Sequence, residues 1–316
     1  MSRSTIGAPV NRQPRNNHYV PDFLLKQWTG ADNKLTYFKW LPTGVLNAGR
    51  CSSRGAGVER DLYSQMNSAG DVDTTLEREL FTKLVDDPSA PIHAKLLGGQ
   101  LGKLSNEERS LWSRFLVAQL IRVPSMVQYL CDAGQQLMLR DIDDIKPPEE
   151  IRDQPGSSTL QQYLETEAAW RLDNESKRAL EIIVKSPQLN GVFFGAYWAV
   201  HSITTSNINL IIGDRPLLLE GRMTGLFLFA MPLSPTQLFL ASNDRMAICQ
   251  VAAEKQRDLV RTVNQESTAV ADEYVYATDG KQTALAEGYL RKPGDPDNRH
   301  IVSGLKAALH VDQSTQ

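Results

Sequence analysis

The sequence predicts an α+β fold, because its strand-type and helix-type patterns fall into separate blocks. A β-hairpin pattern comes first, amphipathic helix patterns follow, and short apolar runs separated by Gly, Pro, Asn and Asp fill the C-terminal part. The alternating βαβ units that build a parallel sheet do not occur in this order. We therefore expect an N-terminal β-hairpin, a central helical region and C-terminal antiparallel strands.

The hairpin is predicted over residues 34–47, where a run rich in aromatic and apolar side chains meets the turn Leu41-Pro42-Thr43-Gly44. The first helix is predicted over residues 74–87, because Thr74-Thr75-Leu76-Glu77 has capping-box spacing and apolar residues follow at helical intervals. A second box at residues 105–108 opens a long helix, which Pro124 should bend or end.

A solvated linker is predicted near residues 141–158, where acidic residues, prolines and a Gly-Ser-Ser stretch gather. Another helix should follow from about residue 160 to residue 185. A further helix is marked by Val251, Leu259, Val260 and Val263, and residues 232–235 read as a rigid corner. The expected strands are residues 192–194, 197–203, 209–212, 226–230, 238–241 and 273–277.

Composition predicts a cytoplasmic protein without a membrane partner, since 41% of residues are hydrophobic, 22% are charged and no apolar run reaches the roughly 18 residues of a membrane span. Residues 1–16 carry arginines but no apolar centre, so they read as a disordered basic tail and not as a secretory signal. The three cysteines form no Cys-x-x-Cys pair and are expected to be reduced.

Charge and motifs narrow the functional classes. The net charge of −3 gives no global attraction to phosphate backbones, so nucleic acid would need a local basic patch. The P-loop, the His-Glu-x-x-His helix and the Gly-x-Ser-x-Gly elbow are all missing from the sequence, which disfavours P-loop nucleotide hydrolysis, zincin proteolysis and α/β-hydrolase chemistry.

His18 is the first candidate for a functional residue. It lies in Asn17-His18-Tyr19-Val20-Pro21, where the proline keeps Val20 out of the helical region and fixes the direction of the chain. A neutral imidazole can act as general base, general acid or metal ligand. The alternative is a structural histidine that hydrogen-bonds a carbonyl and pins the N-terminal strand.

Arg122 is the second candidate, because it continues an apolar face of the long helix, with Gln119 as its neighbour three residues earlier. A buried guanidinium needs an anionic ligand or an internal carboxylate. Glu77 is a plausible internal partner, whereas Glu79 should face Lys83 and Asp86 and be solvated.

Asp214 and Asn264 complete the set of candidates. Asp214 follows the strand expected at residues 209–212 and precedes x-Pro, so it serves either as a functional carboxylate or as an ordinary turn former. Asn264 lies on the helix that carries Val260 and Val263, where it would orient a ligand or cap a strand.

Four of these segments together resemble the bacterial domain-of-unknown-function family 4238: residues 18–21, residues 111–122, Gly213-Asp214-Arg215-Pro216 and residues 232–235. The resemblance runs from about residue 17 to about residue 278. It implies one α+β domain over residues 17–278, with residues 279–316 as a C-terminal extension. Relatives carry Thr-Ser-Asp-x-Pro where this chain has Ile212-Gly213 before the aspartate. The resemblance names relatives but no reaction.

Two hypotheses follow for the function. In the first, the chain hydrolyses a phosphodiester or another anionic substrate, a small molecule or a nucleic acid, and a divalent metal ion is one option for a cofactor. His18, Glu77 and Asp214 would then be catalytic, and Arg122, Gln119 and Asn264 would bind the substrate. In the second, the same residues form a structural polar network in a non-catalytic binding or regulatory module. The oligomeric state is left open by the sequence.

Overall fold

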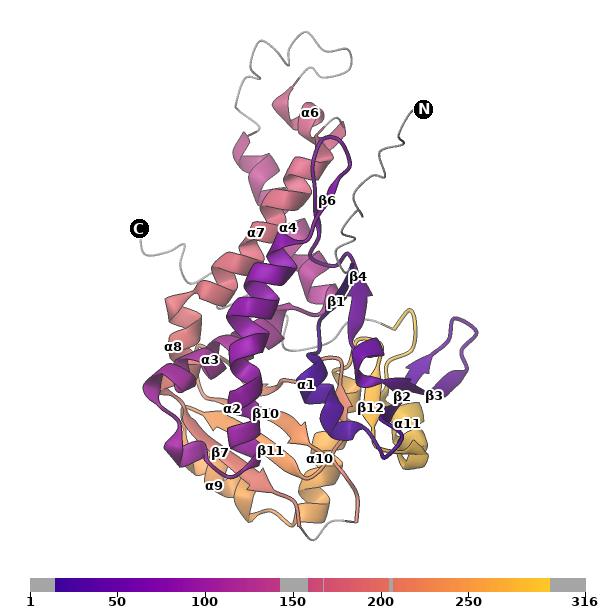
Figure 1. Ribbon diagram of the computed structural model, residues 1–316, viewed down its shortest axis with the longest axis vertical. Coiled ribbons are helices and arrows are strands. Elements are labelled where there is room, and N and C mark those ends of the chain that lie inside the picture. The colour runs from indigo at the N-terminus through magenta and orange to yellow at the C-terminus, as the bar shows by residue number, and fades with distance from the viewer. Residues whose placement is uncertain (1–14, 143–158, 167, 205–206, 296–316) are drawn as a thin grey trace, which may run out of the picture.

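A computed structural model describes residues 15–142, 159–166, 168–204 and 207–295 of the chain. Strands gather in its N-terminal part, helices in its centre and antiparallel strands in its C-terminal part, which confirms the α+β prediction (Figure 1). The acidic linker lies outside the described residues except at its start, and so do all but the last residues of the basic tail.

One sheet joins the two ends of the described chain, in the order β3-β2-β12-β8. The predicted hairpin forms its outer part, as β2 (Lys34–Trp40) and β3 (Leu46–Ser52). β12 (Val275–Ala277) pairs antiparallel with β2 on one side and with β8 (Ile212–Gly213) on the other. The N-terminal hairpin is therefore held by a C-terminal strand.

The second sheet is antiparallel in the order β7-β11-β10-β9 and lies between two layers of helices. Its strands are β7 (Tyr197–Ser202), β11 (Gln237–Ser242), β10 (Phe227–Ser234) and β9 (Leu218–Gly221). Because side chains alternate along a strand, Phe227, Phe229 and Met231 join the main core. Leu228 and Ala230 point to the opposite face, which α9 (Arg245–Ala253) and α10 (Gln256–Ala269) cover.

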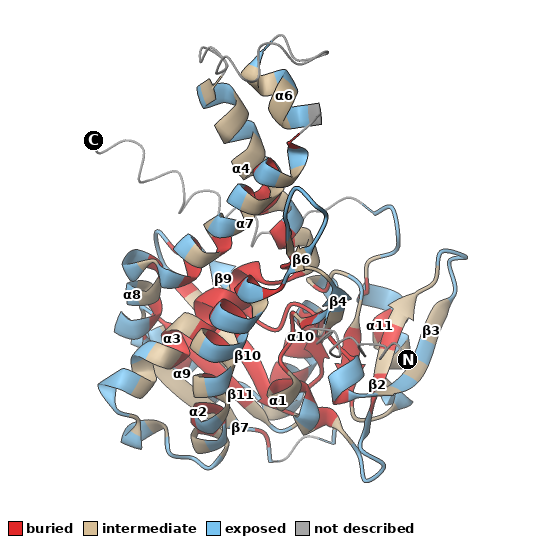
Figure 2. Cartoon of the chain, turned by 45° about the horizontal axis from the view of Figure 1, so that its top comes forward, coloured by how far each residue is buried: buried red, intermediate tan, exposed pale blue. Residues whose placement is uncertain are grey.

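The helical body is built around α3 (Asn106–Ile121), which is buried along nearly all of its C-terminal half. Pro124 ends α3 and opens α4, as expected. Figure 2 shows that buried residues concentrate in the body, whereas the projecting arm of α4, α6 and α7 carries mainly exposed and intermediate residues. The other central segments are η3 (Leu76–Asp86), α2 (Asp87–Leu97), η4 (Leu101–Lys103), α4 (Pro124–Ile142), α6 (Leu160–Thr166), α7 (Ala169–Lys185) and α8 (Pro187–Gly195).

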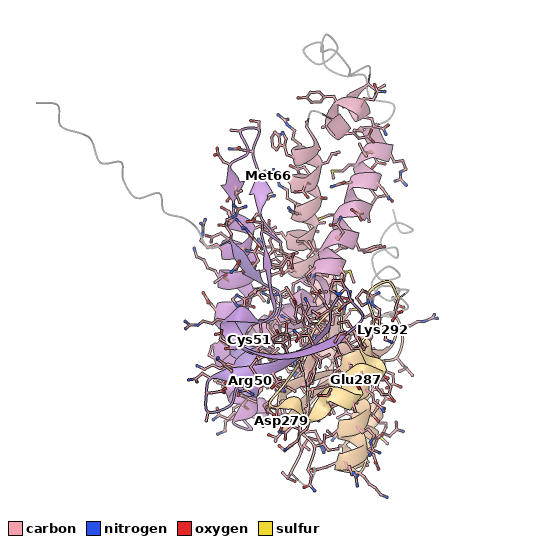
Figure 3. All side chains as sticks on the ribbon, turned by 90° about the vertical axis from the view of Figure 1, so that its right-hand side faces the viewer. Arg50, Cys51, Met66, Asp279, Glu287 and Lys292 are labelled. Carbon is pink, nitrogen blue, oxygen red and sulfur yellow. The ribbon has the colours of Figure 1, made fainter. Side chains whose placement is uncertain are left out.

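Two small strand pairs attach the N-terminal part to these helices. β1 (Asn16–His18) pairs with β4 (Val58–Arg60), and β5 (Gln65–Met66) pairs with β6 (Val72–Asp73). The second pair, which carries Met66, runs beside the arm (Figure 3), and Asn174 of α7 hydrogen-bonds to the Met66 backbone. The remaining short segments are α1 (Asp22–Leu25), η1 (Lys26–Trp28), η2 (Ser53–Gly55), η5 (Gly280–Gln282) and α11 (Thr283–Tyr289).

Several sequence-based expectations differ from the structure. Residues 192–194, expected as a strand, lie in α8, because Pro187 opens a helix there and the Ser186 hydroxyl accepts the Leu189 N–H. Of the strand expected at residues 209–212, only Ile212 is in β8. The segment 232–235 was expected to be a rigid corner, but its first three residues belong to strand β10, which ends at Ser234. The pairing of β10 with β11 shifts in register between Pro232 and Ser234.

Helix boundaries also differ. The single helix expected over residues 160–185 is divided into α6 and α7, and the one expected around residues 251–263 is divided into α9 and α10. The box at Ser105 forms in full, with the Ser105 hydroxyl and the Glu108 carboxylate each accepting a backbone N–H. At Thr74 no capping box forms, because Glu77 faces the strand that carries His18.

Two predictions from composition can be compared with the described residues. Cys51, Cys131 and Cys249 are free thiols, as expected. Within the described part of the chain, no helix combines the length and the apolar character needed to cross a membrane.

Candidate functional site

Arg122 lies at the C-terminal cap of α3 with a side chain that is 0% exposed. Its guanidinium makes a two-pronged ion pair with Asp86, with Nη1 at 2.7 Å from Oδ1 and Nη2 at 3.1 Å from Oδ2. Burial is the largest single influence and acts to lower the pKa of Arg122, but the charge and hydrogen bond of Asp86, together with Tyr63 and Glu77, hold this pKa above its usual value. The carboxylate that Arg122 needs is therefore Asp86, and not Glu77 as the sequence favoured.

His18 is held against the same guanidinium through its backbone. The Nη2 of Arg122 donates to the His18 carbonyl oxygen at 2.5 Å. Burial, followed by the charge of Arg122, lowers the pKa of the imidazole, so the ring is neutral at pH 7. A hydrogen bond to the Arg54 backbone works in the opposite direction, and the ring Nε2 has no partner among the described residues.

Glu77 approaches the strand of His18 from η3 and accepts the backbone N–H of His18. Burial raises the pKa of Glu77 to about 7, while Arg122 acts to lower it and Asp86 acts to raise it. Near neutral pH this carboxyl is therefore partly protonated. Its Oε2 atom is buried and has no partner in the described part of the chain.

The conformation of η3 brings Glu77 and Asp86 together, because residues 76–86 form a π-helix. In an α-helix, positions 77 and 86 would lie on opposite faces, since nine residues at 3.6 per turn make about two and a half turns. A π-helix bonds residue i to i+5 and has roughly 4.4 residues per turn, so nine residues make about two full turns. Both carboxyl groups consequently face Arg122.

Tyr63 lies beside Arg122, and Asn17 of β1 is hydrogen-bonded to the backbone of Tyr63. The Tyr63 hydroxyl donates to the Arg122 carbonyl oxygen at 2.5 Å, and the Tyr63 N–H donates to the Asn17 Oδ1 at 3.3 Å. The Nδ2 of Asn17 has no described partner. Gln119, one turn before Arg122 on α3, is 3% exposed, and both of its amide atoms lack partners among the described residues. We call His18, Glu77, Asp86 and Arg122, with Tyr63 and Asn17, the Arg122 cluster.

Asp214 belongs to a different part of the structure. Its Oδ1 accepts the N–H of Asp272 at 2.7 Å, and its Oδ2 accepts those of Glu273 and Tyr274 at 2.7 and 2.8 Å. Burial raises the pKa of Asp214 to about 6, against the effect of these N–H donors. Its carboxylate therefore fixes the turn before β12, and none of these hydrogen bonds goes to His18.

Asn264 is likewise engaged with backbone groups. Its Oδ1 accepts the Ile211 N–H at 3.0 Å, and its Nδ2 donates to the Asn209 carbonyl oxygen at 2.9 Å. This corresponds to the strand-capping alternative. The structure thus brings His18, Glu77 and Arg122 together, with Gln119 one turn away, and leaves Asp214 and Asn264 at structural positions.

Two residues of the cluster were missed by the sequence reasoning. Asp86 was assigned to the solvated face with Glu79, although it pairs with Arg122 while Glu79 pairs only with exposed neighbours. Its position directly before Asp87-Pro88 resembled a helix end. Tyr63 carried no sequence signal, because its role depends on its approach to the end of α3.

A metal site does not emerge from this arrangement. Among the described residues, no group of three or more His, Cys, Asp or Glu side chains is placed to hold an ion. Asp214, expected as a catalytic carboxylate, accepts backbone N–H groups with both oxygens.

The fold and the cluster define an α+β protein whose N-terminal strand lies over a buried ionisable group. The family model described as "Protein of unknown function (DUF4238)" matches residues 16–281. The chain therefore belongs to this family, and the match agrees with the span of about 17–278 that the sequence motifs indicate. Comparison with curated proteins and with solved structures found no match.

Proposed function

We propose that the Arg122 cluster is the acid–base site of a hydrolase that acts on a phosphodiester or another anionic substrate. The observation that carries the proposal is that the pKa values of two neighbouring groups, His18 and Glu77, are shifted in opposite directions. The pKa of His18 is lowered, which keeps its imidazole neutral, and the pKa of Glu77 is raised to about 7, which keeps its carboxyl partly protonated. One group is thus a base and the other an acid at the same pH.

The two groups also have free atoms for a reaction. The Nε2 of His18 and the Oε2 of Glu77 have no partner among the described residues. In the proposed step, a water oxygen attacks the phosphorus atom while His18 Nε2 takes the water proton. The bond from phosphorus to the leaving oxygen breaks, and Glu77 gives that oxygen its proton.

The charge balance of the cluster supports an anionic substrate in the same pH range. When Glu77 is protonated and His18 is neutral, the charges of Arg122 and Asp86 cancel, and no net negative charge repels the substrate. When Glu77 loses its proton, the cluster becomes negative. Binding and acid catalysis are therefore lost together as the pH rises through about 7.

The test is hydrolysis of bis(p-nitrophenyl) phosphate by the purified chain, with and without added Mg²⁺ or Mn²⁺. We expect kcat/KM to fall above about pH 7 and to be reduced at least about a hundredfold by either His18→Gln or Glu77→Gln. The matched control is Glu79→Gln, on the exposed face of the same π-helix. Wild-type activity in both cluster variants would refute the proposal.

The second candidate is the non-catalytic binding or regulatory module, and the Arg122–Asp86 ion pair favours it. Arg122 already has a carboxylate and a carbonyl as partners and is 0% exposed, as in a structural network. Thermal unfolding of the same variants separates the two candidates. A fall of many degrees in His18→Gln and Glu77→Gln, with no hydrolysis by the wild type, supports the module.

A further inference from the structure

A cavity of about 890 Å³ lies on the side of the β7-β11-β10-β9 sheet that faces away from the main core. Strands β9, β10 and β11 form one wall, and α10 with the end of α9 forms the other. This volume is in the range of small-molecule sites, which are roughly 300–1,000 Å³. None of the residues of the Arg122 cluster lines it.

The cavity exists because the second face of the sheet is incompletely covered. Leu228 and Ala230 point toward α10 from the central strand β10, yet both are only half-buried. Ala230 is too small to fill the space between β10 and the helix. Apolar surface left open to water costs about 25 cal/mol per Å², so a ligand with an apolar body would gain by covering it.

The mouth of the cavity is charged and predominantly acidic. Glu220, Glu254 and Glu266 line it together with a single basic residue, Arg222. All four are exposed, and no ion pair involving them is found in the described part of the chain. Three carboxylates against one guanidinium give the mouth a negative potential that favours a cation over an anion.

We propose that this cavity binds a small amphipathic amine. The apolar chain of the ligand lies between the sheet residues Leu228 and Ala230 and the α10 residue Val263, and the ammonium group lies near Glu266, three residues further along α10. Burial of the ligand chain against the apolar wall gives the affinity, and the acidic mouth makes the cavity prefer a cation to an anion.

The probe for the test is decyltrimethylammonium, titrated below its micelle concentration into the full chain in a calorimeter, with decanoate as the matched anion. We expect saturable one-to-one binding of the cation, with an affinity at least about tenfold higher than that for decanoate. The double variant Glu254→Gln/Glu266→Gln should bring the two affinities close together. The control is Glu287→Gln on α11 (Figure 3), which should change neither.

Filling the cavity gives the second arm of the test. Ala230→Phe should weaken cation binding by about tenfold or more, since the ring occupies the space of the ligand chain. Val251→Trp fills the space from the opposite wall, in case Ala230→Phe does not fold, and thermal unfolding reports the fold of both. Equal binding of decanoate and of the cation, or unchanged cation binding in a folded filled variant, overturns the proposal. Dimerisation that either filled variant abolishes in sedimentation would assign the cavity to a second copy and also overturn it.

Discussion

Glu77 and Asp86 both act on the guanidinium of Arg122, although an α-helix would turn them to opposite faces. The π-helix of residues 76–86 brings them to one face, and they then take different roles. Asp86 makes the ion pair, whereas Glu77 is left with a raised pKa and a buried oxygen without a described partner. π-helices are rare and occur mostly as single-turn bulges inside α-helices, and such bulges are frequent at functional sites.

Removing Asp86 should destabilise the protein strongly, because it leaves the buried charge of Arg122 unpaired. We expect Asp86→Ala to lower the free energy of unfolding by about 3 kcal/mol, near the low end for buried pairs because the Asp86 side chain keeps 18% exposure. Urea unfolding measures the change. Glu79→Gln, which breaks an exposed pair with Lys83 on the same helix, should cost far less, because exposed ion pairs contribute little to stability. Similar losses in both variants would contradict the assignment.

The raised pKa of Glu77 should make the protein less stable as the pH rises. The folded pKa of about 7 lies above the ordinary value of 4.5, so the unfolded state loses its proton first as the pH increases. Below about pH 4.5 the group has no effect, and its destabilisation grows until about pH 7. The free energy of unfolding of Glu77→Gln, measured relative to the wild type, should therefore rise between pH 5 and pH 8. A difference independent of pH would show that Glu77 has an ordinary pKa.

Removing the charge of Asp214 should destabilise the fold, because its carboxylate holds backbone N–H groups. In Asp214→Asn, one carboxylate oxygen becomes an amide NH₂ that faces backbone N–H groups of residues 272–274. We expect a loss of roughly 2–3 kcal/mol, since hydrogen bonds to charged groups contribute about 1.5–3 kcal/mol each. Differential scanning calorimetry should show a melting temperature roughly 3–5 °C lower. Asp279→Asn, at an exposed cap that bonds the Lys281 N–H, should change it much less. Unchanged melting would return Asp214 to the list of site candidates.

His93 should remain neutral in the folded protein down to acidic pH. Its ring packs against Phe23 and Trp112, and its Nε2 lies 2.9 Å from the Leu233 carbonyl oxygen. Burial lowers the pKa of His93 to about 4, although the bond to Leu233 acts to raise it. The unfolded state therefore binds a proton first as the pH falls from 6.5, and the stability due to neutral His93 is lost down to about pH 4.

NMR titration of the histidine ring signals tests the expectation for His93. The His93 signals should stay at their neutral positions down to about pH 5, and the free energy of unfolding of His93→Phe should depend less on pH between 6.5 and 4 than that of the wild type. A titration midpoint of His93 near 6.5 would contradict the buried assignment.

Part of the candidate site could be predicted from the sequence, because a few single residues allow few structural interpretations. Arg122 continues an apolar face, and a guanidinium placed there needs an acid whatever the fold. Pro21 keeps Val20 out of the helical region, which fits the extended strand that carries His18 just before it. The identity of the acid could not be read, because helical periodicity assumed 3.6 residues per turn and the segment is a π-helix.

The sequence by itself determined the class of fold, the first sheet's hairpin, the family and the need of Arg122 for a counter-charge, because these depend on local patterns of polarity and on single buried groups. Tertiary structure decided which acid meets Arg122, that Asp214 holds the turn before β12, and that β10 leaves a cavity beneath α10. Each of these depends on which distant segments pack together and on how a helix winds between them. Neither is set by the neighbours of a residue in the chain.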